Sequence, residues 1–497
     1  MSTLSDRLRA IVGTGLRSAS EATVRLKPDT AFDVAIPGVP SNLDVAIPGV
    51  SSNVVSGFSR TVADLERVLG GEWQHRQGVS CFVVERRRDP ETRYGREVLK
   101  AIAGRLVESS AEAVLVAGGA PVRPPFVFFD LETTGLSGGA GTYAFLVGCG
   151  TFDDDGGFLT RQFVLVRHGD ERQLLQMVAA ELSRASALVS FNGKSFDAPL
   201  IETRYLFHRL KWTGGRLPHL DVLHPARQFW GERVRLKADT TIEGTDNAVG
   251  GVGVHRDVRG VRLQPDRAAE PASCSLIALE EQLLGVRRTG DVPGFEIPSR
   301  YFQFVRTGDA RPLAAVLEHN RLDLLSLAGL TARLLDLVRT GPGAARHARE
   351  ALALGRVYAR CGLDGRAREA YERAIENRDA PMAYTETSMV SIKMDALRSL
   401  ALLSRRTRRY EDAAAYWREL LDVPACPPHV VREASEALAI HHEHRAHDLF
   451  AAKAFALRSL SGRAGIAGMN EAREPAWNRA VQHRLARIQR KIESLEP

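Results

Sequence analysis

The stretch Phe126-Val-Phe-Phe-Asp130-Leu-Glu132-Thr-Thr-Gly135 predicts a buried β-strand that carries two acids near its end. Its opening apolar run is typical of a strand inside a sheet. Because side chains alternate along a strand, Asp130 and Glu132 point to the same face. Two adjacent carboxylates repel each other unless cations neutralise them, and Mg²⁺ and Mn²⁺ prefer such oxygen ligands. The motif therefore indicates a divalent-metal site, with an ordinary solvated strand end as the alternative.

A third acid follows a second predicted strand. The apolar run 187–191 leads through an Asn-Gly-Lys turn to Asp197, which opens a predicted helix. Loops that join strands to helices gather around the site of an α/β fold, so Asp197 is a candidate site residue. A simple helix cap, formed by Ser195 or by Asp197 itself, is the alternative. Lys194 and Arg204 lie close by in the sequence, either as phosphate contacts or as solvated surface charges.

A fourth acid lies in a long predicted helix over 313–337. His319 and Asp323 are four residues apart, so they face the same way, one turn from each other. Asn320 is adjacent to this pair. Such a pair often belongs to a helix surface or a cap, but here it is surrounded by valine and leucine. That setting favours a partly buried site.

Length and composition limit the classes of protein to which the chain can belong. A length of 497 residues predicts about three domains, and an apolar content of 44% suffices for ordinary cores. Five scattered cysteines without a C-x-x-C pair argue against a zinc site or a disulfide framework. No secretory leader and no long apolar run occurs, so we expect a soluble, cytoplasmic protein. The net charge of +7 is compatible with a polyanionic partner.

The predicted domain organisation follows from changes in composition and periodicity along the chain. Residues 1–56 contain an internal Pro-Gly repeat and are interpreted as a flexible low-complexity segment. Residues 57–121 form a small lead-in region packed on the next domain. The central α/β domain covers 122–338 and is interrupted by a low-complexity insertion at 234–272. Residues 341–497 follow as a helical domain.

The C-terminal region 341–497 is helical by pattern. Its segments 351–358 and 367–374 resemble a tetratricopeptide helical pair, with small residues where the two helices approach each other. The region holds 26 Lys and Arg against 20 Asp and Glu, so most of the chain's positive surplus lies here. We expect it to bind a protein partner, or to hold a nucleic-acid strand through the arginines at 405–409. A solvated turn between two helices is the alternative interpretation of these arginines.

The order of these motifs resembles the DEDD 3′–5′ exonuclease group of the ribonuclease-H-like superfamily. Asp130 and Glu132 match its first motif, Asp197 its second and Asp323 its third. Four sequence segments look closest to the YprB-type branch of this group: "DLETTGLSGGAGTYAFLVG", "SFNGKSFDAPLIETRY", "HLDVLH" and "LEHNRLDLLSL". The resemblance covers 122–338. It implies an α/β ribonuclease-H-like domain with a mixed sheet and flanking helices, followed by an all-α tetratricopeptide-like repeat domain.

One motif departs from the group's pattern. The group usually has, before the last Asp, either a Tyr with three residues between them or a His with four residues between them. Here His319 is separated from Asp323 by three residues. The resemblance assigns His319 to the orientation or deprotonation of the attacking water, a task that suits a group titrating near neutrality. Asn320 is a second candidate for the positioning role.

The resemblance also implies two bound ions, Mg²⁺ or Mn²⁺, about 3.5–4 Å apart. Asp130 would bridge both ions, and Glu132 and Asp323 would complete the shell of one. Asp197 would reach the other, partly through water. The implied reaction is the hydrolysis of phosphodiester bonds from the 3′ end of single-stranded DNA or RNA.

The resemblance implies five contacts to the substrate strand. They are made by Thr133, Asn192, Lys194, Phe196 and Asn320. The alternative is an inactive nucleic-acid-binding or protein-interaction scaffold. The complete set of acids favours the enzyme, because buried carboxylates are costly to keep without a function.

Overall fold

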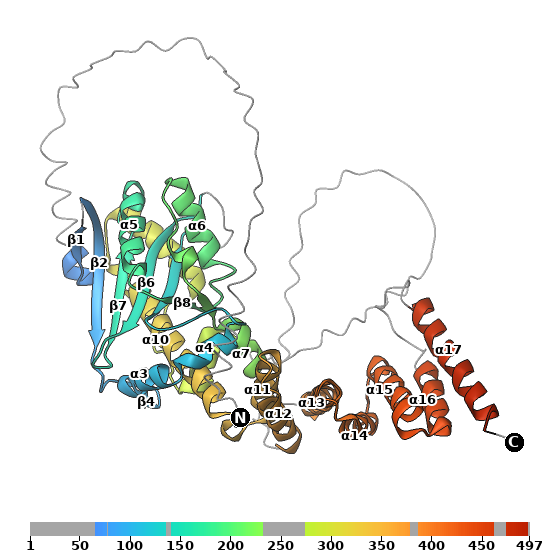
Figure 1. Ribbon diagram of the computed structural model, residues 1–497. Helices are drawn as coiled ribbons and strands as arrows, with labels where there is room; N and C mark the ends of the chain where they lie inside the picture. Colours follow the sequence, from blue (N-terminus) through green and yellow to red (C-terminus); the bar gives the residue numbers. More distant parts are fainter. Residues whose placement is uncertain are drawn as a thin grey trace, which may run out of the picture. The chain divides into compact units, whose positions relative to one another are not determined.

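A computed structural model gives the arrangement of most of the chain (Figure 1). The residues that it describes are 65–76, 78–135, 141–231, 274–377, 386–461 and 474–495. The expected flexible segment 1–56 and the whole of the expected insertion at 234–272 lie outside these ranges. No helix among the described residues is long and apolar enough to cross a membrane.

Residue contacts divide the chain into two compact units. Unit 1 consists of Met1–Val222 and Leu283–Arg339, and unit 2 of Leu223–Gln282 and Thr340–Pro497. All four predicted acids belong to unit 1. Each unit is described separately below.

Unit 1 contains a mixed seven-stranded sheet with helices packed against it, as the α/β prediction requires (Figure 1). The strand order is β1-β2-β7-β6-β5-β8-β9, antiparallel from β1 to β5 and parallel from β5 to β9. The strands are β1 (Glu72–Arg76), β2 (Val79–Arg88), β5 (Phe126–Thr133), β6 (Ala144–Phe152), β7 (Phe158–Val164), β8 (Ala187–Ser190) and β9 (His219–Asp221), with β3 (Arg93–Tyr94) and β4 (Glu97–Val98) as a separate pair. The helices are α3 (Leu99–Glu108), α4 (Ala113–Val116), α5 (Glu171–Leu182), α6 (Asp197–Phe207), α9 (Ile297–Thr307) and α10 (Arg311–Thr340).

The region 57–121 contributes two strands to this sheet. β2 pairs with β7 from Phe82 opposite Val164 to Arg88 opposite Phe158. The lead-in region expected at 57–121 is thus joined to the sheet of unit 1 by strand pairing. The physical reason is that β7 would otherwise leave an open row of backbone donors and acceptors at its outer edge. The apolar centre of β2 covers that edge and is itself buried.

The register of the central strands determines which face of the sheet carries the acids. Asp130 on β5 lies opposite Gly148 on β6, and Gly148 lies opposite Gln162 on β7. These three residues form one row across the sheet. A Cβ on Gly148 would lie 2.2 Å from Oδ1 of Asn320, so the missing side chain allows α10 to pack closely on this face. The odd-numbered neighbours on β5, such as Phe129 and Leu131, belong to the main apolar core.

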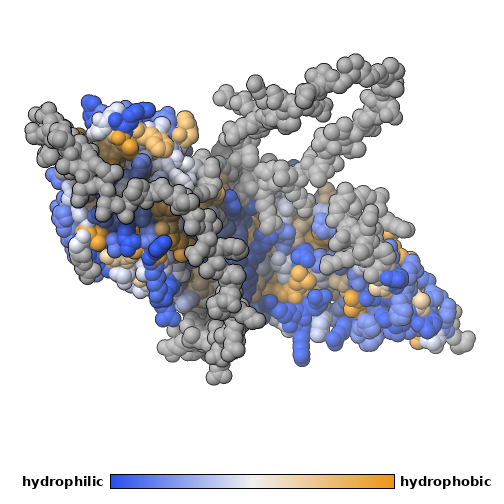
Figure 2. Space-filling model, turned by 90° about the horizontal axis from the view of Figure 1, so that it is seen from above, coloured by the Kyte–Doolittle hydropathy of each residue, from blue (hydrophilic) through white to orange (hydrophobic). Residues whose placement is uncertain are grey.

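Unit 2 is built of helices packed in pairs, which follow one another along the chain (Figure 1). Gly355 lets two of them approach closely, because a Cβ there would lie 2.4 Å from the ring of Tyr371. Figure 2 shows mainly hydrophilic residues on the visible face of these helices, with small apolar patches. The helices are α7 (Leu223–Phe229), α8 (Leu276–Leu279), α11 (Ala348–Arg360), α12 (Asp364–Glu376), α13 (Glu386–Arg406), α14 (Tyr410–Leu421), α15 (Pro428–His441), α16 (Leu449–Ser461) and α17 (Glu474–Glu493).

A buried ion pair joins α5 to α6 in unit 1. Arg204 is 1% exposed and donates to Glu171 through Nε at 2.6 Å and Nη2 at 2.5 Å. His208 also contacts Glu171, with Nε2 2.7 Å from Oε2. Arg204 is therefore neither a phosphate contact nor a solvated surface charge, which corrects both readings of the sequence. The helix turns this side chain into the core, where a carboxylate satisfies its donors.

Replacing Arg204 by Met should destabilise unit 1 by about 3–5 kcal/mol, because the change leaves Glu171 buried without its main partner. Arg184→Met is the matched control, since Arg184 is exposed and contacts Glu181 only at 3.4 Å. The control should cost less than about 1 kcal/mol. Calorimetric unfolding of the full chain measures both effects. Equal transition temperatures for the two variants would contradict the structural role of the buried pair.

Candidate active site

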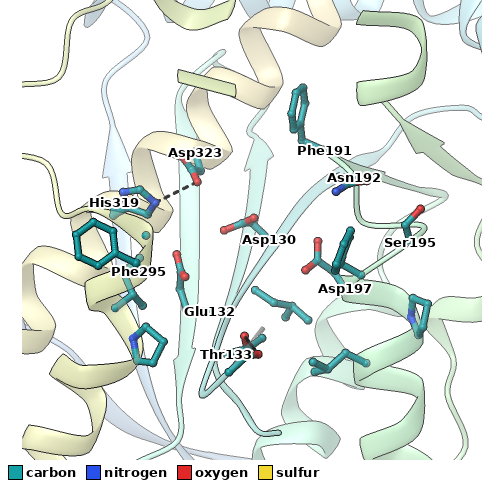
Figure 3. Close-up of a pocket in the computed structure, with 18 of the residues that line it drawn as sticks. Asp130, Glu132, Thr133, Phe191, Asn192, Ser195, Asp197, Phe295, His319 and Asp323 are labelled. Carbon is teal, nitrogen blue, oxygen red and sulfur yellow. Dashed lines mark hydrogen bonds and ion pairs between the residues drawn. The ribbon is translucent and has the colours of Figure 1, made fainter. Parts of the chain in front are cut away.

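A cavity of about 780 Å³ in unit 1 brings the four predicted acids together (Figure 3). Asp130 and Glu132 come from β5, Asp197 from the start of α6, and Asp323 from α10. His319 lines the same cavity beside Asp323. Segments separated by nearly 200 residues therefore meet at one place. The remaining lining residues are Leu131, Thr133, Gly135, Phe191, Asn192, Ser195, Phe196, Pro199, Leu200, Thr203, Gly294, Phe295, Ile297 and Pro298.

Two hydrogen-bonded amides hold Asp130 in place. Nδ2 of Asn320 donates to Oδ2 of Asp130 at 2.8 Å. Nε2 of Gln162 in turn donates to Oδ1 of Asn320 at 2.8 Å and to the carbonyl oxygen of Leu317 at 2.7 Å. Gln162 and Asn320 are both fully buried. Because the Asn320 oxygen accepts from Gln162, its NH₂ group must face the carboxylate.

Asn320 therefore lies beneath the site. The resemblance implies that it contacts the substrate strand, whereas its side chain has no exposed surface in the structure. We reassign it as a positioning residue for Asp130. Gln162 was missed in the sequence because a single glutamine on a strand carries no recognisable signal. Only the register of β5, β6 and β7 places it in this row.

A buried carboxylate shapes the turn that delivers Asp197. Asp221, at the end of β9, accepts backbone hydrogen bonds from Asn192 at 2.8 Å and Lys194 at 3.0 Å. Asn192 adopts a left-handed conformation with φ of 68°, which Asn tolerates better than most residues. The sequence motif "HLDVLH" contained Asp221, but a short strand with polar ends did not reveal its bonding partners.

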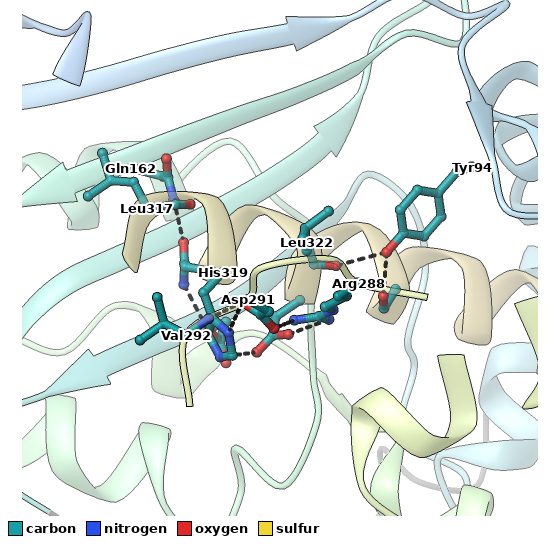
Figure 4. A network of polar contacts seen from close by, with 12 residues as sticks. Tyr94, Gln162, Arg288, Asp291, Val292, Leu317, His319 and Leu322 are labelled. Atoms are coloured by element: carbon teal, nitrogen blue, oxygen red, sulfur yellow. Dashed lines mark hydrogen bonds and ion pairs between the residues drawn. The ribbon is translucent and has the colours of Figure 1, made fainter. Parts of the chain in front are cut away.

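A second polar network surrounds His319 (Figure 4). Nδ1 of His319 lies 2.8 Å from Oδ1 of Asp291, and Nε2 lies 3.5 Å from Oδ2 of Asp323. Arg288 bridges the two carboxylates, with Nη1 3.1 Å from Asp291 and Nη2 2.6 Å from Asp323. An ionised carboxylate can only accept, so Asp291 selects the tautomer in which Nδ1 carries the proton. Nε2 is then the basic nitrogen.

Neither Asp291 nor Arg288 was recognised in the sequence, where both lie in a Pro- and Gly-containing loop. Burial alone would raise the pKa of Asp291, but the hydrogen bond from His319 and the charge of Arg288 hold it below its ordinary value. Asp291 therefore remains a carboxylate near neutral pH. The guanidinium of Arg288 also lies against Asp323, one of the predicted metal ligands.

The acids of the cavity destabilise one another's charges. Burial and then the charge of Asp323 raise the pKa of both Asp130 and Glu132 well above ordinary values. Burial and then the charge of Asp221 raise the pKa of Asp197 to about 7. Such clustered shifts are typical of functional sites. A positive charge in the cavity would favour the ionised forms.

The donor set fits divalent cations. Four carboxylates are hard oxygen ligands of the type that Mg²⁺ and Mn²⁺ prefer, and bound cations would relieve the repulsion that raises their pKa values. Within the described residues, no three His, Cys, Asp or Glu side chains already stand close enough together to hold a metal ion. The fit therefore rests on the chemistry of the acids and on their common cavity.

Two exposed aromatic residues stand at the cavity. Phe196, beside Asp197, is 60% exposed, and Phe295, from the short 3₁₀ helix Gly294–Glu296 before α9, is 80% exposed. In Figure 3, Phe295 lies next to His319, on the opposite side of Asp130 from Asp197. Large apolar side chains at such exposure cost free energy in water and often mark a binding surface.

The other predicted strand contacts are placed as follows. Thr133 and Asn192 line the cavity, and the Thr133 hydroxyl donates to the carbonyl oxygen of Gly135 at 3.0 Å. Lys194 is exposed and is not part of the cavity wall. Its backbone N–H, however, is bonded to Asp221.

Comparison with known proteins agrees with this arrangement. Residues 127–335 match the family model described as the RNase_H superfamily, and this range includes every acid of the cavity. The chain is similar to the uncharacterized protein YprB of Bacillus subtilis (strain 168). The two are 29% identical over 375 residues, which cover 74% of this chain and 75% of the Bacillus protein. Residues 127–335 therefore constitute an RNase_H superfamily domain, joined to a C-terminal region of paired helices.

Proposed function

We propose that the chain is a metal-dependent 3′–5′ exonuclease that hydrolyses single-stranded nucleic acid. The observation that carries the proposal is the meeting of Asp130, Glu132, Asp197 and Asp323 in one cavity. Burial raises the pKa of all four carboxyl groups, and repulsion from the other acids of the cavity adds to this effect at Asp130 and Glu132. Nucleic-acid hydrolysis agrees with the superfamily of the domain. The exonuclease type and the 3′–5′ direction rest on the resemblance of the motifs.

The four acids would hold the divalent ions, either Mg²⁺ or Mn²⁺. Such ions, when bound, supply a nucleophilic water and stabilise the leaving oxygen of a phosphodiester. The hydrogen bond from Asn320 leaves the second oxygen of Asp130 to serve as a ligand. Gln162 holds Asn320 in the required orientation, so the row across the sheet fixes the direction of Asp130.

His319 is proposed as the group that orients the attacking water and accepts its proton. Asp291 accepts from Nδ1, so that Nε2 keeps its lone pair and faces the cavity side of α10. As Nε2 gains a proton, the neighbouring carboxylates stabilise the imidazolium. Asp291 is a positioning residue in this scheme, because it acts through His319.

The aromatic side chains at the cavity suit an unpaired strand end. Phe196 and Phe295 present exposed rings on which bases can stack, and stacking tolerates any base sequence. The cavity volume of about 780 Å³ is in the range of pockets that enclose a small organic molecule, such as a nucleotide.

Asp130→Asn should reduce strand degradation by about 100-fold or more, the factor that a loss of a few kcal/mol in transition-state stabilisation produces. The assay follows 5′-labelled single-stranded DNA and RNA with Mn²⁺, Mg²⁺ or EDTA. The wild-type chain should shorten the strands from the 3′ end, and EDTA should stop it. Asp309→Asn is the matched control, since Asp309 lies in unit 1 outside the cavity.

Degradation by Asp130→Asn at the rate of Asp309→Asn would refute the assigned site. A wild-type chain that binds both strands but cuts neither would favour the inactive scaffold instead. In that case the helical region would become the functional part.

Asp291→Asn should lower kcat by about 100-fold and change KM little, because it disturbs the tautomer of His319 without removing a surface that binds the strand. Glu318→Gln serves as control, since Glu318 precedes His319 but pairs with Arg88 and Arg321. Steady-state kinetics separate the two parameters. A rise in KM at unchanged kcat would mean that Asp291 shapes the binding surface instead.

Phe295→Ala should raise KM for single-stranded oligonucleotides by about 10-fold, since base stacking contributes about 1–3 kcal/mol per base. Phe295→Trp should keep KM near the wild-type value, because it preserves an aromatic face. Phe450→Ala is the control, as Phe450 is 72% exposed in unit 2. If the alanine variants at 295 and 450 behaved alike, stacking on Phe295 would be excluded.

A further inference from the structure

The helices of unit 2 enclose an open groove lined by arginines. Two cavities, of about 590 and 510 Å³, share Ala359, Tyr371 and Arg406 and so form one continuous depression. A smaller space of about 30 Å³ continues it and shares Gln228 and Arg356 with the first. The walls come from α7, α11, α12 and α13.

The lining of this groove is strongly cationic. Arg356 and Arg360 come from α11, and Arg405 and Arg406 from the end of α13. Arg349 adds a fifth guanidinium at the small end. Asp395 is the only acid among the described residues that line the three spaces. The lining of the groove therefore carries five arginines against a single acid.

Part of this charge is not neutralised within the described part of the chain. Arg356 pairs with Asp395 at 2.7 Å, and Arg406 pairs with Asp364. Arg360 and Arg405 are both exposed, and neither forms an ion pair with any described residue. Clustered guanidinium groups repel one another, so an anion that binds them relieves an unfavourable interaction.

The spacing of these arginines suits an extended anion with repeated charges. Arg356 and Arg360 are four residues apart on α11, which places them about 6 Å apart along the helix axis. Arg405 and Arg406 extend the positive line onto a second helix. Guanidinium groups bind phosphate oxygens through two parallel N–H donors, and they are weakly hydrated. Ser399 adds a hydroxyl group to the same wall.

We propose that this groove binds the phosphate backbone of a nucleic-acid strand, as a site separate from the acid cavity of unit 1. The guanidinium groups line spaces that join along two helices. This arrangement favours a phosphodiester chain, which carries a charge at every backbone repeat, over an acidic peptide, which carries charges only at its acidic residues. The proposal gives the positive surplus of the helical region a ligand of defined chemistry. It does not require the exonuclease chemistry, because binding through phosphates is independent of cleavage.

The test measures the binding of labelled oligo-dT and oligo-U to the full chain carrying Asp130→Asn, in EDTA, so that no strand is cut. Arg360→Gln with Arg405→Gln removes two groove charges from exposed positions. The matched control is Arg458→Gln with Arg479→Gln, two exposed arginines of unit 2 that do not line the groove. Circular dichroism checks that both double variants fold like the parent.

The groove variant should bind at least about 10-fold more weakly than the control. The slope of log K against log salt should become less negative by about 1.4, since each phosphate contact on a single strand contributes about 0.7. Equal affinity and equal slope in the two double variants would overturn the proposal. A competition with poly-glutamate of the same charge and concentration gives a second test. If poly-glutamate displaced the strand from the parent chain but not from the groove variant, the groove would bind an acidic protein segment, and the proposal would be overturned.

Because binding is measured without metal and without cleavage, this result is independent of the activity assay. A groove that binds strands in an inactive chain would leave the present proposal standing and refute only the exonuclease. If the wild-type chain cut strands but the groove bound none, the exonuclease would stand and the groove proposal would be refuted.

Discussion

Repulsion among buried carboxylates is the constraint on which the arrangement of unit 1 depends. Asp130 and Glu132 are held on one face of β5, and Asp323 faces them from α10. Bringing such charges together out of water is unfavourable, so the surrounding structure must compensate for it. Arg288 and Asn320 provide part of that compensation, one by charge and the other by a hydrogen bond.

The packing of α10 on the sheet fixes the position of Asn320, one of the two compensating residues. Gly148 leaves room for Asn320, and Gln162 fixes the orientation of the Asn320 amide. A larger residue at 148 would push α10 away from the sheet and thereby separate Asp323 from Asp130. The backbone register of three strands is thus coupled to the direction of one carboxylate. Asp221 fixes the position of Asp197 in a similar way, because it accepts backbone hydrogen bonds from the turn that precedes Asp197.

Much of the site could be predicted because its chemistry is concentrated in short motifs. Asp130 and Glu132 share a face by strand alternation, and His319 and Asp323 share one by helical spacing, so local periodicity alone indicated both pairs. Two other interpretations failed. Arg204 was read as a surface or phosphate-binding charge, whereas it is buried against Glu171, and Asn320 was read as a strand contact, whereas it is enclosed beneath Asp130. Both errors concern which way a polar side chain points, which depends on packing.

The sequence by itself determined the α/β class of the central domain, the helical C-terminal region and the set of candidate acids, because these follow from local periodicity and short-range spacing. The mixed sheet was implied by the resemblance of the motifs. Only the tertiary structure decided that β2 completes the sheet, that Asp291 and Arg288 reach His319 and Asp323, and that five arginines gather in one groove. The physical reason is that these contacts join residues far apart in the chain. Such contacts depend on strand register and helix packing, which no single segment specifies.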